Sequence, residues 1–260
     1  MSENQHRYFI ELAYKGSNYH GWQIQPNAIT VQEELNKALS ILSKEKIDTL
    51  GCGRTDTGVH ASQFYAHFDS KFPVDETKTW VKKLNSILKD DIFIFDIHEV
   101  NHDAHARFDA TSRSYSYYIA KHKSIFQKEL MWYTPIKLNV DYLNSLTEIL
   151  KSAQQFESFS KTGVEQSTYL CDISEAMWTE HEHCYQFTIS ANRFLRGMVR
   201  AIVGTMYEFN KTELPKSELQ KILDAADRGK AGHAAPPQGL FLEQITYPYL
   251  NKTSQSPFQK

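Results

Sequence analysis

The feature that most constrains the fold is the irregular order of strand-like and helix-like segments. Short alternating segments rich in aromatic and β-branched residues predict strands at 7–14, 62–68 and 92–100. Apolar residues at helical spacing predict helices beginning after Thr30, in a capping-box pattern, and at 80–88. These segments do not follow the regular strand–helix–strand period of a parallel α/β sheet. The first half of the chain therefore predicts a fold of mixed α and β structure.

The second half of the chain repeats this mixture. The segments expected there are strands at 113–121 and 239–247, a hairpin at 172–179 and 183–190, and helices at 141–151, 194–209 and 215–225. A polar stretch at 101–105 is the candidate domain boundary. The sequence thus predicts an N-terminal domain at 6–102, a C-terminal domain at 103–247 and a mobile tail at 248–260.

The overall charge lowers the expectation of nucleic-acid binding without excluding it. The 260-residue chain carries a net charge of -2, with 23% charged and 41% hydrophobic residues, a balance typical of soluble globular proteins. Such a charge argues against coating nucleic acid by bulk charge but leaves room for a local basic cleft. No apolar run fits a signal peptide or a membrane span, and the three cysteines form no CxxC pair. We therefore expect a cytoplasmic protein that does not associate with membranes.

The most informative polar residues lie in a glycine-rich loop at 50–61, which contains GCGRTDTGVHA. Its glycines free the backbone to approach a ligand, and Arg54 and Asp56 place a guanidinium two residues from a carboxylate. A dinucleotide-binding fingerprint would need glycine at Asp56 and a helix after it, but a strand-like segment follows. From the residues alone, a ligand site and an ordinary glycine turn with solvated charges are equally compatible with this loop.

A second candidate is the strand segment RSYSYYIAK, in which Arg113, Tyr115 and Tyr117 share one face. Two tyrosines beside an arginine would suit unstacked nucleic-acid bases. The simpler alternative places both tyrosines in the core and Arg113 at its rim, since tyrosine is common in strands.

A third candidate is the predicted helix at 194–209. At about 100° per residue, its apolar side chains fill one broad arc, and Arg193, Arg196 and Arg200 cluster at the edge of that arc. Arg200 is placed to reach inward at a domain interface. The simpler interpretation of Arg193 and Arg196 is a solvated polar face.

Metal and hydrolase sites are not indicated. The pairs His102/His105 and His181/His183 lack a second ligand pair at zinc spacing, and the chain contains no HExxH motif. No GxSxG motif of a serine hydrolase occurs either. We therefore expect no metal.

Six blocks in the chain, taken together and in order, resemble the TruA-type tRNA pseudouridine synthases. The blocks are YKGSNYHGWQIQ from Tyr14, TVQEELNKAL from Thr30, GRTDTGVHA from Gly53, ARFDATSRSYSYYI from Ala106, ANRFLRGMVRAIVG from Ala191 and APPQGLFL from Ala235. The resemblance runs from about residue 7 to 247. Lys15, Cys52 and Ser62 depart from the residues usual in that family, which bears on substrate detail more than on activity.

The resemblance implies an α+β pseudouridine synthase fold, with two α/β halves whose largely antiparallel sheets flank a central active-site cleft. It implies isomerisation of uridine to pseudouridine at positions 38, 39 and 40 in the anticodon stem-loop of tRNA, without a cofactor. It also implies a homodimer that holds tRNA across both subunits.

The resemblance assigns a role to each candidate residue. Asp56 would be the catalytic carboxylate, Arg200 would keep it ionised and oriented, and Tyr115 would stack on the uracil. Because a stem base cannot reach Asp56 inside the helix, the target nucleotide should be flipped out. Arg54 would fill the vacated space or hold a phosphate. Further RNA contacts are expected from Arg113, Arg193 and Arg196.

Two alternatives have other consequences. A non-catalytic RNA-binding protein could use the same scaffold, since a fold alone does not fix function. A glycosidase acting on a small nucleoside would normally need a second catalytic carboxylate, and no partner for Asp56 stands out.

Overall fold

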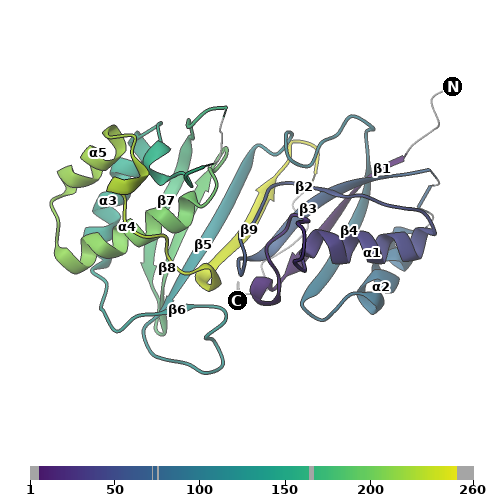
Figure 1. Ribbon diagram of the computed structural model, residues 1–260, viewed down its shortest axis with the longest axis horizontal. Helices are drawn as coiled ribbons and strands as arrows, with labels where there is room; N and C mark the ends of the chain where they lie inside the picture. The colour runs from purple at the N-terminus through teal and green to yellow at the C-terminus, as the bar shows by residue number, and fades with distance from the viewer. Residues whose placement is uncertain (1–5, 72, 75, 164–166, 251–260) are drawn as a thin grey trace. The chain divides into compact units, whose positions relative to one another are not determined.

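The computed structural model describes residues 6–71, 73–74, 76–163 and 167–250 (Figure 1). Two compact units divide the chain: unit 1 comprises the residues up to 111 and those from 242, and unit 2 comprises 112–241. These units have other bounds than the predicted domains at 6–102 and 103–247. From 251 onward, the tail predicted at 248–260 lies outside the described residues.

Long-range hydrogen bonds explain why the units have these bounds. The Arg7 guanidinium donates to the Ala104 carbonyl, and the Tyr247 hydroxyl donates to the Ala106 carbonyl. The polar stretch at 101–105 therefore lies within unit 1. These partners lie far apart in the sequence, so local composition does not reveal them.

The sheet of unit 1 has the strand order β4-β1-β3-β9. Its strands are β1 (His6–Tyr14), β3 (His60–Ser70), β4 (Ile92–Val100) and β9 (Leu240–Thr246), with the short β2 (Leu50–Gly51) paired to β3. The first two residues of β9 belong to unit 2. β1 pairs antiparallel with both β3 and β4. The strands predicted in this part of the chain are confirmed.

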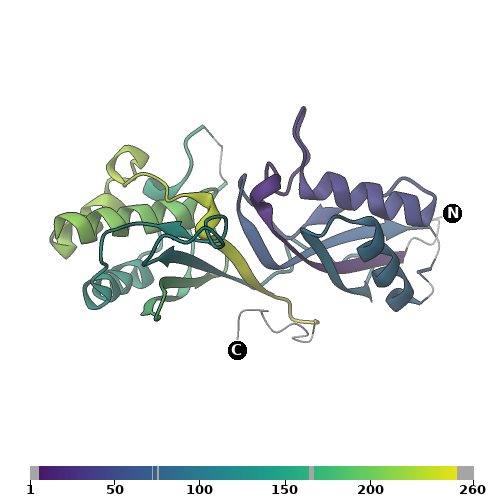
Figure 2. The ribbon, with the colours of Figure 1, turned by 90° about the horizontal axis from the view of Figure 1, so that it is seen from below.

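Two helices belong to unit 1, α1 (Val31–Ser43) and α2 (Thr77–Ile87). The Thr30 side chain accepts the Glu33 N–H at 3.4 Å, which confirms the predicted cap. α2 packs against β4 and contacts α1 (Figure 2). On one face of the sheet, Tyr14 and Phe64 meet Trp22. On the other face, Phe9 and Tyr65 contact Tyr247.

The sheet of unit 2 has the order β5-β8-β7 and is antiparallel. Its strands are β5 (Ser112–Ala120), β7 (Ile173–Glu180) and β8 (Cys184–Ala191), with β6 (Trp132–Tyr133) in a short parallel pairing with β5. The hairpin predicted from the sequence is formed by β7 and β8. Together the units give the α+β fold with largely antiparallel strands that the sequence predicts.

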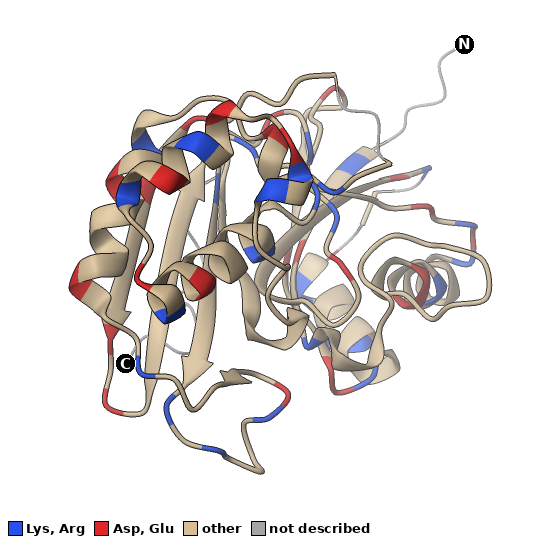
Figure 3. Cartoon of the chain, turned by 60° about the vertical axis from the view of Figure 1, so that its left-hand side comes forward, with Lys and Arg blue, Asp and Glu red and all other residues tan. Residues whose placement is uncertain are grey.

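One helical layer covers this sheet. α3 (Val140–Ser152) packs against β7 and contacts both α4 (Met198–Thr212) and α5 (Lys216–Asp224). The remaining helical segments are single 3-10 turns, η1 (Gly16–Asn18), η2 (Glu157–Phe159), η3 (Arg228–Lys230) and η4 (Pro237–Gly239). Figure 3 shows both signs of charge interspersed along the helices of unit 2, as in the pair Lys221–Glu218 at 2.7 Å.

α4 begins later than the predicted helix at 194–209. Gly197 has φ 73°, a left-handed conformation that ends any helical run from the preceding residues. Phe194 and Leu195 therefore precede the helix. Hydrophobic periodicity missed this because an apolar residue before a helix can satisfy the same spacing as one inside it.

Across the described part of the chain, no helix combines the length and the apolar character needed to cross a membrane.

Candidate active site

The loop between β2 and β3, which carries Asp56, is held through its backbone. The Cys52 N–H donates to the Tyr65 carbonyl at 2.8 Å, and the Val59 N–H donates back to the Asp56 carbonyl at 3.1 Å. A second segment meets the loop from outside: the Trp22 N–H donates to Thr55 O. These three hydrogen bonds join backbone atoms, so they hold the loop without using its side chains.

Two glycines allow this second segment to lie against the loop. A Cβ on Gly21, which has φ 84°, would lie 2.2 Å from the Thr55 carbonyl oxygen, and a Cβ on Gly16 would lie 2.0 Å from the Val59 carbonyl oxygen. Both distances are too short for any side chain. This close backbone contact gives a physical reason for the glycines in the block YKGSNYHGWQIQ.

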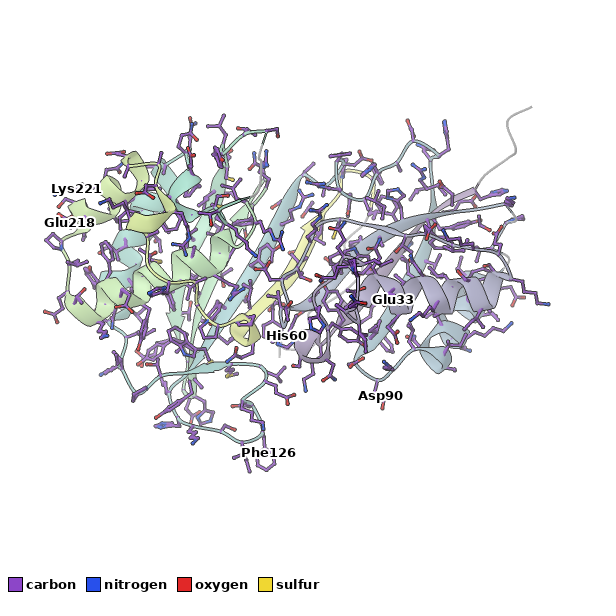
Figure 4. All side chains as sticks on the ribbon, in the orientation of Figure 1. Glu33, His60, Asp90, Phe126, Glu218 and Lys221 are labelled. Atoms are coloured by element: carbon purple, nitrogen blue, oxygen red, sulfur yellow. The ribbon has the colours of Figure 1, made fainter. Side chains whose placement is uncertain are left out.

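Side chains also fix the first part of the same segment, at residues 14–19. The Tyr14 hydroxyl is 2.8 Å from the Thr55 hydroxyl, and the buried His60, labelled in Figure 4, accepts the Gly16 N–H through Nδ1 at 3.0 Å. Asp91 accepts hydrogen bonds from the Asn18 amide and from the Tyr19 hydroxyl. Burial and this carboxylate raise the pKa of the Tyr19 phenol, which keeps it a hydrogen-bond donor.

Within unit 1 the predicted site residues differ in exposure. Asp56 is partly buried, whereas Arg54 is exposed. A carboxylate on a loop whose backbone is fixed by its neighbours is pre-organised, because little conformational freedom remains to be lost when a substrate binds.

Arg200 lies in the first turn of α4 and is held by the segment that leads to η4. Its Nε–H donates to the Ala235 carbonyl at 2.7 Å, and the Ala235 N–H donates to the Arg200 carbonyl at 2.9 Å. A Cβ on Gly204 would lie 1.7 Å from the His233 carbonyl oxygen, so this segment lies directly on the helix. Arg200 is therefore positioned by a hydrogen bond from its own side chain to the neighbouring segment at Ala235 and by the contact of that segment with the helix.

Tyr115 and Tyr117 occupy different environments on β5. Tyr117 is fully buried, and its hydroxyl donates to the Pro236 carbonyl at 2.7 Å. Burial raises the pKa of Tyr117, although the charge of Arg200 acts in the opposite direction. Tyr115 is only partly buried, and its ring meets Phe194 edge-on at 5.1 Å. The alternative that both tyrosines belong to the core thus describes Tyr117, whereas Tyr115 lies at the edge of the core.

The remaining predicted arginines lie outside regular helix. Arg113 Nη1 donates to the Asn192 carbonyl at 2.9 Å. Arg193 and Arg196 precede α4, so they do not lie on one arc of this helix with Arg200. Of these two, Arg193 is partly buried and Arg196 is exposed.

The histidine pairs do not assemble a metal site within the residues that the structure describes, where no group of three potential ligands occurs. His105 uses Nδ1 to accept two backbone N–H groups. His181 Nε2 lies 2.8 Å from the Gln186 amide oxygen.

The sequence pattern alone assigned no role to Gly16, Gly21, Asp91 or Ala235. For Gly16 and Gly21, the sequence offered one indication, which is that two glycines stand five residues apart before a predicted helix. The bonds of Asp91 and Ala235 join segments 73 and 35 residues apart, and no local pattern reports these pairings.

Comparison with known proteins gives a consistent result. The family model for tRNA pseudouridine synthase matches residues 153–248. The chain is 44% identical to tRNA pseudouridine synthase A of Parabacteroides distasonis over 93% of this chain and 96% of that protein. It is 46% identical to the protein of the same name from Bacteroides thetaiotaomicron, covering 93% and 91% of the two chains. Identity to the Clostridium acetobutylicum protein is 36%, with coverage of 92% and 98%.

The antiparallel α+β units and the similarity to these proteins define the class as tRNA-modifying isomerases. The chain belongs to the tRNA pseudouridine synthase A family.

Proposed function

We propose that this protein isomerises uridine to pseudouridine at positions 38, 39 and 40 in the anticodon stem-loop of tRNA, with Asp56 as the catalytic carboxylate. The observation that carries this proposal is the state of the loop at 50–61 in a chain that belongs to this family. Asp56 is partly buried there, and hydrogen bonds fix the backbone on both sides of it. Family membership supports uridine isomerisation in tRNA. The three positions follow the resemblance of the sequence blocks.

The chemistry requires one glycosidic bond to break and another to form. The bond from C1′ to N1 of uracil is cleaved, C1′ joins C5, the proton at C5 leaves and N1 gains a proton, so the base and the sugar must stay together throughout. A carboxylate can take part as a nucleophile or as a base, and Asp56 must be ionised in either role.

The other candidate residues take supporting roles in this proposal. Arg200 stabilises and orients the charged form of Asp56. Tyr115 stacks on the flipped uracil and assists removal of the C5 proton. Arg54 fills the space that the base leaves or holds a phosphate. Its exposure supports this role.

The remaining arginines, Arg113, Arg193 and Arg196, would contact the RNA backbone. The active form in this proposal is a cytoplasmic homodimer that binds tRNA across both subunits.

The decisive test compares Asp56→Asn and Asp56→Ala with the unmodified protein. Both variants should bind a tRNA transcript within a few fold of wild type and release no tritium from tRNA labelled at C5 of uridine. Asp56→Asn keeps nearly the same shape, so its loss of turnover would isolate the need for charge. Retained turnover would exclude Asp56 as the catalytic group. A wild-type chain that binds tRNA but releases no tritium would favour the non-catalytic alternative.

A further inference from the structure

The turn at 104–109, which connects β4 and β5, is held by an unusually complete set of hydrogen bonds. Each backbone N–H in the turn is a donor. In chain order the acceptors are Asn101 O, Asp109 Oδ2, His67 Nδ1, His105 Nδ1 for two successive groups, and His105 O, at 2.8–3.2 Å. The turn therefore has a single defined conformation, although Arg107 and Phe108 within it are exposed.

Side chains of unit 1 fix the turn further. The Tyr249 hydroxyl donates to Asp109 at 2.7 Å, and Arg7 donates to the Ala104 carbonyl at 3.1 Å. Arg7 is in turn held by two hydrogen bonds to Asp69, at 2.7 and 2.8 Å. A turn anchored in this way can present a side chain in a fixed direction.

The side chain that the turn presents is Phe108, which is 74% exposed. Its ring lies on the ring of His105, with centroids 4.2 Å apart and an angle of 33° between the planes. The Arg107 guanidinium carbon lies over the Phe108 ring, 5.6 Å from its centroid. A rigid aromatic ring next to a guanidinium, open to solvent, is the arrangement with which proteins stack unpaired bases.

The surroundings of Phe108 favour a base over a protein partner. Asn101, His102, Asp103 and Arg107, which are close to Phe108 in the sequence, are exposed and polar and do not form a contiguous apolar patch with the ring. A protein interface of ordinary size needs such a patch at its centre. The acidic Asp103 and Asp109 beside the turn also argue against a run of phosphates and leave the face of a base as the group that the ring can contact.

The turn and Asp56 lie at opposite ends of β3. The Asp56 loop precedes His60 at the start of the strand, whereas the turn is bonded to His67 near its end. The seven residue steps between them span roughly 23 Å. A nucleotide on Phe108 is therefore not the nucleotide whose base reaches Asp56.

We propose that Phe108, supported by His105 and flanked by Arg107, is a stacking platform for an unpaired nucleotide of the RNA substrate other than the target uridine. The proposal rests on the proposed function for the identity of the substrate as RNA. The platform would contribute to the choice of substrate by requiring an unpaired base at a fixed distance from the reaction site.

Binding of an unmodified tRNA transcript tests the platform. Phe108→Ala should weaken binding about tenfold, because one base loses its stacking partner. The same factor should be found at low and at high salt, since stacking releases no counterions. Phe93→Ala is the matched control, because Phe93 is also an exposed phenylalanine of unit 1, at 52%, and it should bind as wild type does.

Two further measurements separate stacking from a structural effect. Phe108→Trp should restore binding, and its added tryptophan emission should be quenched by the tRNA transcript. A blunt RNA duplex without unpaired bases should bind wild type and Phe108→Ala equally. Both variants should unfold at the wild-type temperature, because the ring is mostly exposed.

Several results would overturn the platform. Unchanged tRNA affinity of Phe108→Ala would do so, as would an equal loss of affinity for the blunt duplex. A change in oligomeric mass at unchanged tRNA affinity would assign the ring to contact with a second copy of the chain. Wild type that binds tRNA without forming pseudouridine would refute the proposed function, but the binding comparison would still decide the platform.

Discussion

The two units hold their candidate site residues in different ways. In unit 1, the loop that carries Asp56 is held by backbone contacts and by one side-chain bond from Tyr14 to Thr55, and the close contacts with Gly16 and Gly21 leave no room for a side chain at either glycine. In unit 2, Arg200 is held by its own side chain, whose Nε–H is bonded to the Ala235 carbonyl. The positions of the two groups should therefore respond differently to substitution.

The difference follows from the size of the two side chains. Aspartate is short, so the place of its carboxylate is decided almost entirely by the place of its backbone. Arginine is long and flexible, and without a bond along its length it would lose rotamer entropy on binding. We therefore expect unit 1 to be sensitive to added atoms in the glycine segment, and unit 2 to be sensitive to the loss of one hydrogen bond.

The largest effect is expected from Gly21→Ala. The new Cβ would lie 2.2 Å from the Thr55 carbonyl oxygen at a backbone φ of 84°, so the loop must move. A displacement of about 1 Å can cost on the order of 100-fold in rate, and the strain should lower the free energy of unfolding by about 3 kcal/mol. Tritium release from C5-labelled tRNA and chemical denaturation measure the two effects.

The chain supplies two controls for Gly21→Ala. Gly53→Ala adds a Cβ in the same loop with nothing within 4 Å, and it should change neither activity nor stability appreciably. Gly197→Ala, in unit 2, has φ 73° and its nearest contact at 3.9 Å, so it should show only the cost of the left-handed backbone, about 1–2 kcal/mol. If Gly21→Ala behaves like Gly197→Ala, the close contact with Thr55 is not what fixes the loop.

Removal of the Arg200 side chain tests the other side of the comparison. Arg200→Gln should lower the single-turnover rate about 100-fold, the order found when one preorganised donor is lost. Arg200→Lys keeps the charge but loses the Nε–H bond to Ala235, and it should fall between wild type and Arg200→Gln. A lysine variant with the wild-type rate would show that charge alone suffices and that the bond to Ala235 does not position the group.

The two modes of support also explain which parts of the site were predictable from the sequence. The capping pattern at Thr30 and the alternation of β1, β4 and β5 are local, so the elements were found with nearly correct bounds. The left-handed Gly197 and the contact of Gly21 with Thr55 are not encoded in any period. Local patterns report which face a residue occupies, but not which distant carbonyl it meets.

The same limit applies to the tyrosines of β5. Alternation correctly puts Tyr115 and Tyr117 on one face, but it cannot say that Tyr117 is covered by the segment at Pro236 while Tyr115 is left at the edge. The polar stretch at 101–105, which lies within unit 1, shows the same limit. Its polar residues look like a linker, yet the turn that follows is bonded to His67, Arg7 and Tyr247.

As the pH falls, unit 1 should lose stability before unit 2 does. His67 is buried and accepts the Ala106 N–H through Nδ1, and burial, helped by Arg7 and His105, lowers its pKa to about 4. Asp69 and Asp109 act in the opposite direction but do not cancel this shift. The described histidines of unit 2, His122, His181, His183 and His233, are all exposed.

The direction of this change in stability follows from proton uptake by the unfolded chain. Below pH 6.5 the unfolded chain protonates His67 while the folded chain does not until about pH 4. Its contribution is therefore present above pH 6.5 and is lost as the pH falls toward 4, by on the order of 2 kcal/mol. Hydrogen exchange resolved by segment at pH 7 and pH 5 should show faster opening of β3 at the lower pH and little change in β8. Equal changes in both strands would contradict this origin.

The smallest effect is expected from Tyr14→Phe, which removes only the hydroxyl 2.8 Å from the Thr55 hydroxyl. One such hydrogen bond contributes about 1 kcal/mol, so the free energy of unfolding should fall by about that amount. Because the backbone contact of Gly21 with Thr55 remains, the loop should keep its place and the rate should fall by less than about tenfold. Tyr133→Phe, at an exposed tyrosine of unit 2, is the control for removal of a phenolic hydroxyl. A loss of rate as large as that of Gly21→Ala would mean that the side-chain bond, and not the backbone contact, positions the loop.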